Sequence, residues 1–206
     1  MNTILFESIS NTINALEINK ISEGRKAILK PLIGYLQNKI ESNKSIRLNF
    51  ICTHNSRRSH LSQIWAQTMA AYYSINNVSC YSGGTEATAM FPKVGETLVN
   101  QGFKINTLSD GNNPVYSIKF SENEPALIAF SKEFSNAFNP TSEFAAIMTC
   151  SSADEACPMV LGCDKRIPIT YEDPKKSDGT PLQTETYLKR SLQIATEMKY
   201  VFSSLI

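Results

Sequence analysis

No apolar run in this 206-residue chain approaches the roughly 20 residues that a helix needs to cross a bilayer, so we expect no membrane-spanning segment. The formal net charge is only +1, which argues against a surface for nucleic acid or membrane. The N-terminal residues lack the basic flank and long apolar stretch of a signal peptide, and we therefore expect a cytoplasmic, reducing location. Five cysteines in such a compartment favour thiol chemistry or a metal site over structural disulfides.

The pattern of apolar residues predicts a helical extension followed by an α/β domain. Residues 3–17 and 22–43 carry apolar residues at helical spacing, so we expect a helical N-terminal extension over 1–44, in which Pro31 kinks or divides the second helix. Residues 45–206 alternate between strand-like and helix-like segments, which indicates one domain with a mostly parallel sheet. The expected strands are 46–52, 78–83, 114–120, 144–149 and 166–170, and the expected helices are 59–74, 92–101, 152–157 and 183–204. The irregular stretch at about 107–142 reads as an insertion that could form a hairpin.

The segment 52–59, Cys-Thr-His-Asn-Ser-Arg-Arg-Ser, joins the end of a predicted strand to the start of a predicted helix. Backbone N–H groups are unpaired at a helix start and the helix dipole is positive there, so a cysteine at this point is favoured as a thiolate. The same N–H groups and the planar guanidinium of Arg58 suit the oxygens of a tetrahedral oxyanion. Ser59 can donate a hydrogen bond to the sulfur of Cys52, and Asn55 can hold the loop in a strained shape. A buried structural cysteine beside two surface arginines is the alternative.

We therefore expect Cys52 to be a nucleophile beneath a bound oxyanion. The expected oxyanion-binding residues are Thr53, His54, Asn55, Ser56, Arg57, Arg58 and Ser59.

These residues resemble the low-molecular-weight tyrosine phosphatase superfamily, which includes the thioredoxin-coupled arsenate reductases. The matching residues are Cys52-Thr53, Asn55-Ser56, Arg58-Ser59, Trp65, Ser82 to Glu86 and Asp173-Pro174. The resemblance covers about residues 46–204 and implies a four-stranded parallel sheet flanked by helices, with the active site at the C-terminal ends of the strands, in agreement with the rule for open α/β sheets. The sequence departs from the family at His54, where a small residue is usual, and at Arg57, where the phosphatases commonly carry a second cysteine.

Asp173 is the expected general acid. Phosphoryl and arsenyl transfer both benefit from a proton donor that faces the departing oxygen, and the resemblance gives that role to the aspartate of the Asp173-Pro174 pair. An ordinary loop turn is the alternative. Lys175 and Lys176 follow where the phosphatases usually have aromatic residues, which argues against an aryl phosphate as the substrate.

Cys150 and Cys157 lie seven residues apart in a segment that we expect to be partly helical. A continuous helix would separate them by about 10.5 Å of rise, whereas a disulfide needs Cα atoms roughly 4.4–6.8 Å apart, so the pair can bond only if the helix unwinds. The resemblance to the reductases implies such a relay, in which Cys150 attacks the adduct on the nucleophile and Cys157 then takes over the disulfide. The alternatives are packing or chance, and a zinc site with Cys163, which lacks the usual Cys-x2-Cys spacing.

Other polar residues near these motifs are expected to have smaller roles. Cys80 and Cys163 are expected to be bystanders, and His60 is expected to be solvated. Some reductases of the family bind potassium beside the loop through Asn, Glu and Ser groups; Asn55 and Ser82 match by position, whereas Gln63 stands in place of the Glu.

The leading hypothesis is an arsenate reductase in which Cys52 attacks arsenic, Arg58 and the loop amides bind the oxygens, and Asp173 protonates the leaving hydroxide. Cys150 and Cys157 would complete the electron transfer, with no organic cofactor or catalytic metal. The external reductant would be thioredoxin or a dithiol protein with a similar potential, about −270 mV. The alternatives are a phosphatase that acts on phosphotyrosine or a small phosphate ester, and a non-enzymatic anion-binding or thiol-regulatory module. The helices of 1–44 could cover the core, mediate a homodimer or bind a partner, and 107–142 could be a lid or a docking surface.

Overall fold

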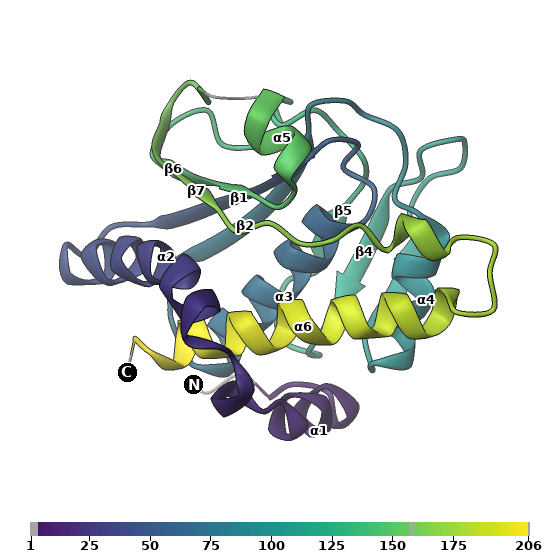
Figure 1. Ribbon diagram of the computed structural model, residues 1–206, viewed down its shortest axis with the longest axis horizontal. Coiled ribbons are helices and arrows are strands. Elements are labelled where there is room, and N and C mark those ends of the chain that lie inside the picture. The colour runs from purple at the N-terminus through teal and green to yellow at the C-terminus, as the bar shows by residue number, and fades with distance from the viewer. Residues whose placement is uncertain (1–3, 157–158, 206) are drawn as a thin grey trace.

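A parallel sheet of four strands lies at the centre of the protein. The computed structural model describes residues 4–156 and 159–205, and its sheet has the strand order β2-β1-β6-β7 (Figure 1). The strands are β1 Ile46–Cys52, β2 Val78–Gly84, β6 Phe144–Met148 and β7 Cys163–Pro168. Because neighbouring strands are parallel, the C-terminal ends of β1 and β6 meet at one edge of the sheet, where open α/β folds bind their ligands. The fold expected from the sequence is confirmed.

Helices pack on both faces of this sheet, which is why its central strands are almost wholly buried. Figure 1 shows α3 and α6 below the sheet and α5 above it. One apolar cluster, which includes Phe50, Trp65 and Phe202, fills one side, and a smaller one around Ile51 and Met148 fills the other. The helices of this domain are α3 Arg58–Tyr72, α4 Pro92–Asn100, α5 Ser151–Ala156 and α6 Gln183–Ser203, with a 3-10 turn, η2 Pro174–Ser177. No helix in the described part of the chain is long and apolar enough to cross a membrane.

The N-terminal extension is helical, as the sequence predicted, and packs against α6 and β7. Its elements are α1 Glu7–Ala15, the 3-10 turn η1 Ile18–Lys20 and α2 Glu23–Glu41. The face of α2 that carries Leu29, Leu32 and Leu36 is fully buried. Pro31 lies inside the continuous helix α2, so it does not divide the helix, and a kink there stays a prediction. Both Pro31 and Ala27, whose carbonyl loses its helical donor, are exposed, and water can bond that carbonyl.

The region expected to be an insertion contains a second, antiparallel sheet. Its three strands are β3 Lys104–Thr107, β4 Tyr116–Lys119 and β5 Leu127–Ala129, in that order. The sequence predicted the middle strand and missed β3 and β5, which at 4 and 3 residues are too short to show a period. Beyond β5 the chain returns to the main sheet. There the Gly84 N–H donates to the Lys132 oxygen at 2.9 Å and the Phe134 N–H donates to the Gly84 oxygen at 2.8 Å. The insertion therefore ends beside β2, next to the loop that follows β1.

Candidate active site

Cys52 is the last residue of β1 and is 3% exposed. Its sulfur lies 3.1 Å from the Ser59 hydroxyl, in the first turn of α3. Asn55 donates to the same hydroxyl at 2.8 Å and accepts the Lys132 N–H at 2.9 Å. Asn55 has a backbone φ of 43°, a left-handed conformation that asparagine tolerates better than most residues. A chain of hydrogen bonds thus runs from the end of the insertion, through the strained residue of the loop, to the hydroxyl beside the sulfur.

The loop after β1 folds tightly against the end of β2. A Cβ atom on Gly84 would lie 2.6 Å from the Thr53 oxygen and 2.7 Å from the Asn55 nitrogen, so only glycine fits there. The residue after Gly84 donates to the Cys52 oxygen at 3.1 Å. The close approach of these two backbones therefore holds the loop in place.

Three carbonyl groups of the loop accept hydrogen bonds from residues outside the loop. In a planar trans peptide the C=O and the following N–H point in opposite directions, so each N–H that follows one of these carbonyls points away from the partner of that carbonyl. The Thr53 carbonyl accepts the Glu86 N–H at 2.9 Å, the His54 carbonyl accepts the Ser131 hydroxyl at 3.0 Å, and the Ser56 carbonyl accepts the Phe91 N–H at 3.0 Å. These N–H groups are therefore the candidates for the oxyanion cradle that the sequence predicted.

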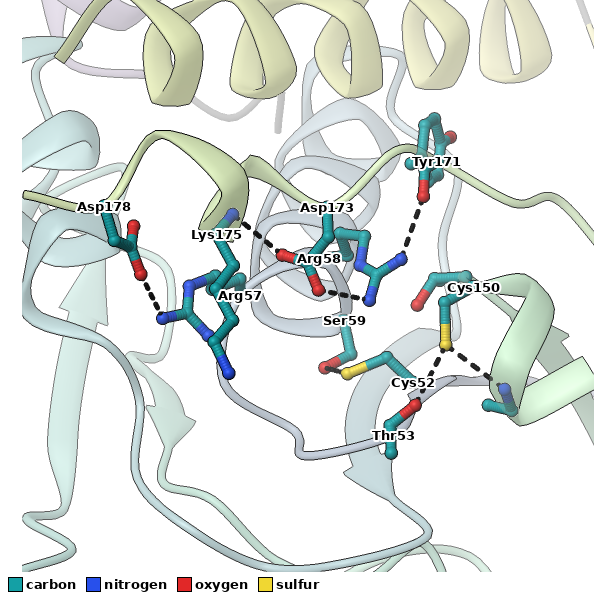
Figure 2. A network of polar contacts seen from close by, with 12 residues as sticks. Cys52, Thr53, Arg57, Arg58, Ser59, Cys150, Tyr171, Asp173, Lys175 and Asp178 are labelled. Carbon is teal, nitrogen blue, oxygen red and sulfur yellow. Dashed lines mark hydrogen bonds and ion pairs between the residues drawn. The ribbon is translucent and has the colours of Figure 1, made fainter. Parts of the chain in front are cut away.

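Arg58 and Asp173 form an ion pair directly over this loop (Figure 2). The Nη2 atom of Arg58 donates to Oδ2 of Asp173 at 2.6 Å, and its Nη1 donates to the Tyr171 oxygen at 2.9 Å. The cavity that these groups share with Cys52 has a volume of about 10 Å³, enough for about one water molecule. Arg58 therefore bonds a carboxylate of its own chain where an oxyanion would bind.

Arg57 was expected to bind the oxyanion, but its side chain is held elsewhere. Its Nε donates to the Tyr187 hydroxyl at 2.6 Å, its Nη2 donates to Asp178 at 2.6 Å, and its guanidinium stacks on Phe91 at 4.2 Å. Figure 2 shows this side chain directed toward Asp178. Arg57 also lines the cavity at Cys52, so its binding of an oxyanion stays a prediction.

His54 and Ser56 line the mouth of the site. The His54 ring is 41% exposed and lies 3.3 Å from a Glu86 carboxylate oxygen, so it belongs to the rim. Ser56 is buried in the loop. The side chains at the mouth are polar, and aromatic walls of the kind that grip a phenyl ring are not among the residues that line this cavity.

His60 was expected to be solvated, and the structure shows the opposite: it has no exposed surface. Its Nδ1 lies 3.3 Å from the Ser82 hydroxyl. Burial, together with the nearby charge of Lys132, lowers the pKa of His60 to about 3. The expectation failed because α3 enters the core at its first turn, beneath the insertion, which sequence periodicity does not reveal.

Lys132 is a buried cation that sequence reasoning missed. Only 2% of it is exposed, and burial lowers its pKa to about 8. Its Nζ donates to the Phe130 oxygen at 3.2 Å and lies 4.3 Å from the Phe130 ring centroid and 5.3 Å from that of Phe138. Two aromatic rings near a lysine are a weak sequence signal for such a site.

The residues that match the family's potassium site do not fit a potassium ion. The Asn55 oxygen already accepts the Lys132 N–H, and Gln63 turns its Nε2 toward the Cys80 oxygen at 3.1 Å. The Lys132 ammonium places a positive charge close to His60, which bonds Ser82. A second cation there would be repelled. Among residues 4–156 and 159–205, no three His, Cys, Asp or Glu side chains gather closely enough to hold a metal.

Cys150 lies beside the loop, between β6 and α5, and is 1% exposed. Its sulfur lies 3.4 Å from the Thr53 hydroxyl and accepts the Ala153 N–H at 3.3 Å, so it takes the position of a helix N-cap (Figure 2). The predicted helix at 152–157 is found as α5. Cys157 lies outside the described residues.

The other two cysteines have weakly acidic thiols. Burial raises the pKa of Cys80, and burial together with the charge of Asp164 raises the pKa of Cys163. Neither residue lines the cavity at Cys52.

No model of a known protein family matches the chain, and no characterised protein matches its sequence. Solved structures do match. A mutant of Bacillus subtilis YwlE has 14% identity and a TM-score of 0.54 over 78% of this chain and 99% of its own. A low-molecular-weight protein tyrosine phosphatase from T. tengcongensis has 16% identity and a TM-score of 0.52 over the same shares. An arsenate reductase in a phosphate-binding state has 16% identity and a TM-score of 0.51, again over 78% and 99%. The chain therefore has the fold of the low-molecular-weight protein tyrosine phosphatases and arsenate reductases.

Proposed function

We propose that the protein is an arsenate reductase in which Cys52 is the nucleophile and Cys150 and Cys157 form a thiol relay with an external dithiol protein of the thioredoxin type. The position of Cys150 carries this proposal. Its sulfur is 3.4 Å from the hydroxyl of Thr53, the residue next to Cys52, and it accepts an N–H at the start of α5. A thiol at the end of the neighbouring strand can attack an adduct on Cys52, whereas ester hydrolysis through Cys52, Arg58 and Asp173 does not need it.

The first step joins sulfur to arsenic. Arg58 exchanges Asp173 for the oxygens of arsenate, and the amides of the loop bind the same oxygens. The Cys52 thiolate then attacks arsenic and one As–O bond breaks. Asp173, released from its ion pair once Arg58 has moved, takes up a proton from the solvent and gives it to the departing hydroxide, which leaves as water.

The second step reduces arsenic. The Cys150 thiolate attacks the sulfur of Cys52, an S–S bond forms, and the electron pair of the S–As bond stays on arsenic, which leaves as arsenite. Cys157 then attacks the sulfur of Cys150 and releases the Cys52 thiolate. The external dithiol reduces the Cys150–Cys157 disulfide, so two electrons pass from the partner to arsenic in each cycle.

Disulfide formation between Cys150 and Cys157 requires α5 to unwind. This helix has 6 residues, well below the roughly 12–15 at which isolated helices become stable, so its opening costs little helix energy. It is tied to β7 by an ion pair of 2.6 Å between Asp154 and Arg166, which is partly exposed and contributes little to holding the helix closed.

A phosphatase is the second candidate, because the contact between Ser59 and Cys52 also suits a phosphocysteine that must release its sulfur. It would use Cys52, Arg58 and Asp173 and would leave Cys150 without a role. The polar mouth of the site, with Lys175 and Lys176 exposed beyond Asp173, favours an inorganic oxyanion over an aryl ester.

The test is arsenate-dependent NADPH oxidation with thioredoxin and thioredoxin reductase, with arsenite measured directly. The wild type and the control Cys163→Ser should turn over repeatedly, whereas Cys157→Ser should release one equivalent of arsenite and stop, and Cys150→Ser should release none. Hydrolysis of an aryl phosphate that survives Cys150→Ser, with no arsenite from the wild type, would replace the reductase with a phosphatase. Loss of both activities would leave an anion-binding module.

A further inference from the structure

Tyr171 connects the two halves of the site through its backbone. Its N–H donates to the Thr149 oxygen at 3.1 Å, and Thr149 precedes Cys150. Its carbonyl accepts Nη1 of Arg58 at 2.9 Å, while Asp173, two residues further on, accepts Nη2 of the same guanidinium (Figure 2). A shift of Tyr171 would therefore change the orientation of Arg58 and the position of Asp173 together.

The ring of Tyr171 is held by a residue of the N-terminal extension. The guanidinium of Arg25, in the first turn of α2, lies over this ring at 4.8 Å from its centroid. Its Nε and Nη2 donate to both carboxylate oxygens of Glu197, in α6, at 2.9 and 2.7 Å. The side chains of Arg25 and Glu197 are 18% and 4% exposed. A two-pronged ion pair fixes the plane of the guanidinium, and a cation stacked on a ring away from water interacts more strongly than at the surface.

We propose that Arg25 is a positioning residue for the active site: it fixes the Tyr171 ring, so that the Tyr171 carbonyl keeps Arg58 aligned and Asp173 faces Cys52. The inference rests on the roles proposed above for Arg58 and Asp173. It gives the N-terminal extension a task in turnover in addition to covering the core.

The decisive measurement is a double-mutant cycle on kcat with Arg25→Met and Asp173→Ala. We expect Arg25→Met to lower kcat by about 10-fold to 100-fold, the scale of loss when a catalytic group is misplaced by an ångström. In the Asp173→Ala background the same substitution should lower kcat by a smaller factor, because one of the two groups that it positions is already gone and only the misalignment of Arg58 remains. An equal loss of kcat in both backgrounds would overturn the proposal, because a residue that only stabilises the fold acts independently of Asp173.

Two further variants separate positioning from folding. Arg25→Met leaves the buried Glu197 carboxylate without a positive partner, with the Gln193 amide still donating to it at 3.0 Å, and a buried charge without a counterion can unfold the protein. The double substitution Arg25→Met with Glu197→Leu removes both charges and should fold, yet it should show the same loss of kcat. Lys30→Ala, at an exposed position on the same helix, is the matched control and should keep the wild-type kcat.

A readout without turnover separates this inference from the reductase proposal. Phosphate should slow the alkylation of Cys52 by iodoacetamide, because Arg58 and the loop amides bind it. If neither arsenate nor an ester is turned over, the reductase proposal fails while the positioning proposal is still tested: Arg25→Met should weaken the phosphate protection several-fold. Unchanged protection and unchanged kcat, with only a lower melting temperature, would show that Arg25 stabilises the fold and positions nothing.

Discussion

In the proposed mechanism Asp173 competes with the oxyanion for Arg58. Its Oδ2 accepts from Arg58 at 2.6 Å, and the pair closes a cavity of about 10 Å³. An oxyanion can bind only after this pair separates, so the free energy of the pair is subtracted from the free energy of anion binding. We therefore expect Asp173→Ala to bind phosphate and arsenate more tightly than the wild type, and to turn over more slowly.

The expected gain in anion affinity follows from the solvent exposure of the Arg58–Asp173 ion pair. A hydrogen bond between charged groups contributes about 1.5–3 kcal/mol when well buried. Here the Arg58 and Asp173 side chains are 12% and 29% exposed, so water screens part of the attraction and roughly 1–2 kcal/mol is a fair value. That corresponds to an anion affinity that is about 5-fold to 30-fold higher in the variant. Loss of the general acid should lower kcat by about 10²-fold to 10⁴-fold.

The assay is the concentration of phosphate that halves the rate of Cys52 alkylation, measured beside kcat for the same proteins. Asp178→Ala is the matched control, because it removes the carboxylate that bonds Arg57 from the other end of the same turn. It should not raise the phosphate affinity. Equal or weaker phosphate binding by a folded Asp173→Ala protein would refute the competition and leave the ion pair as a contact that does not oppose substrate.

Two further substitutions test the supports beneath the loop. Burial lowers the pKa of Lys132 from 10.5 to about 8, so between these pH values the unfolded chain binds more protons than the folded protein. The unfolding free energy of the wild type, relative to that of Lys132→Met, should therefore rise by about 3 kcal/mol as the pH increases from 8 to 10.5. The same change of unfolding free energy with pH in both proteins would contradict this. Gly84→Ala would place a Cβ atom 2.6 Å from the Thr53 oxygen, so it should cost about 1–3 kcal/mol of stability and remove phosphate protection. The control Gly34→Ala, with nothing near its added Cβ inside α2, should gain up to about 1 kcal/mol in the same denaturation assay.

The part of the site that sequence could predict is local. Cys52 ends a strand in which the apolar residues Ile46, Leu48 and Phe50 alternate with other residues, and this period shows in the sequence whatever the partners of the strand are. Ser59 and Asn55 contact each other within one loop and the first turn of a helix, so their roles follow from the loop alone. Hydrogen bonds between residues only 4 or 7 positions apart can be predicted without knowledge of the overall fold.

The part that sequence could not predict depends on distant partners. The bond from Lys132 to Asn55 spans 77 residues, the pair of Arg57 with Asp178 spans 121, and that of Arg25 with Glu197 spans 172. Each pair forms because two surfaces meet in the folded chain, and neither member has a periodic signal of its own. Arg57 illustrates the consequence: its place in the loop predicted an anion ligand, whereas its side chain bonds residues more than a hundred positions away.

Three arginines hold the segment 171–178: Arg25 of α2 and the consecutive Arg57 and Arg58. Arg58 donates to the Tyr171 oxygen and to Asp173, Arg57 donates to Asp178, and Arg25 stacks on the Tyr171 ring. An oxyanion that enters the site has to displace only one of these contacts, the ion pair of Arg58 with Asp173. The other three can persist, so the segment stays anchored on both sides while its carboxylate is released. In the proposed mechanism, opening of the site is therefore a local exchange of partners at one guanidinium, and Asp173 remains over Cys52 when the oxyanion is bound.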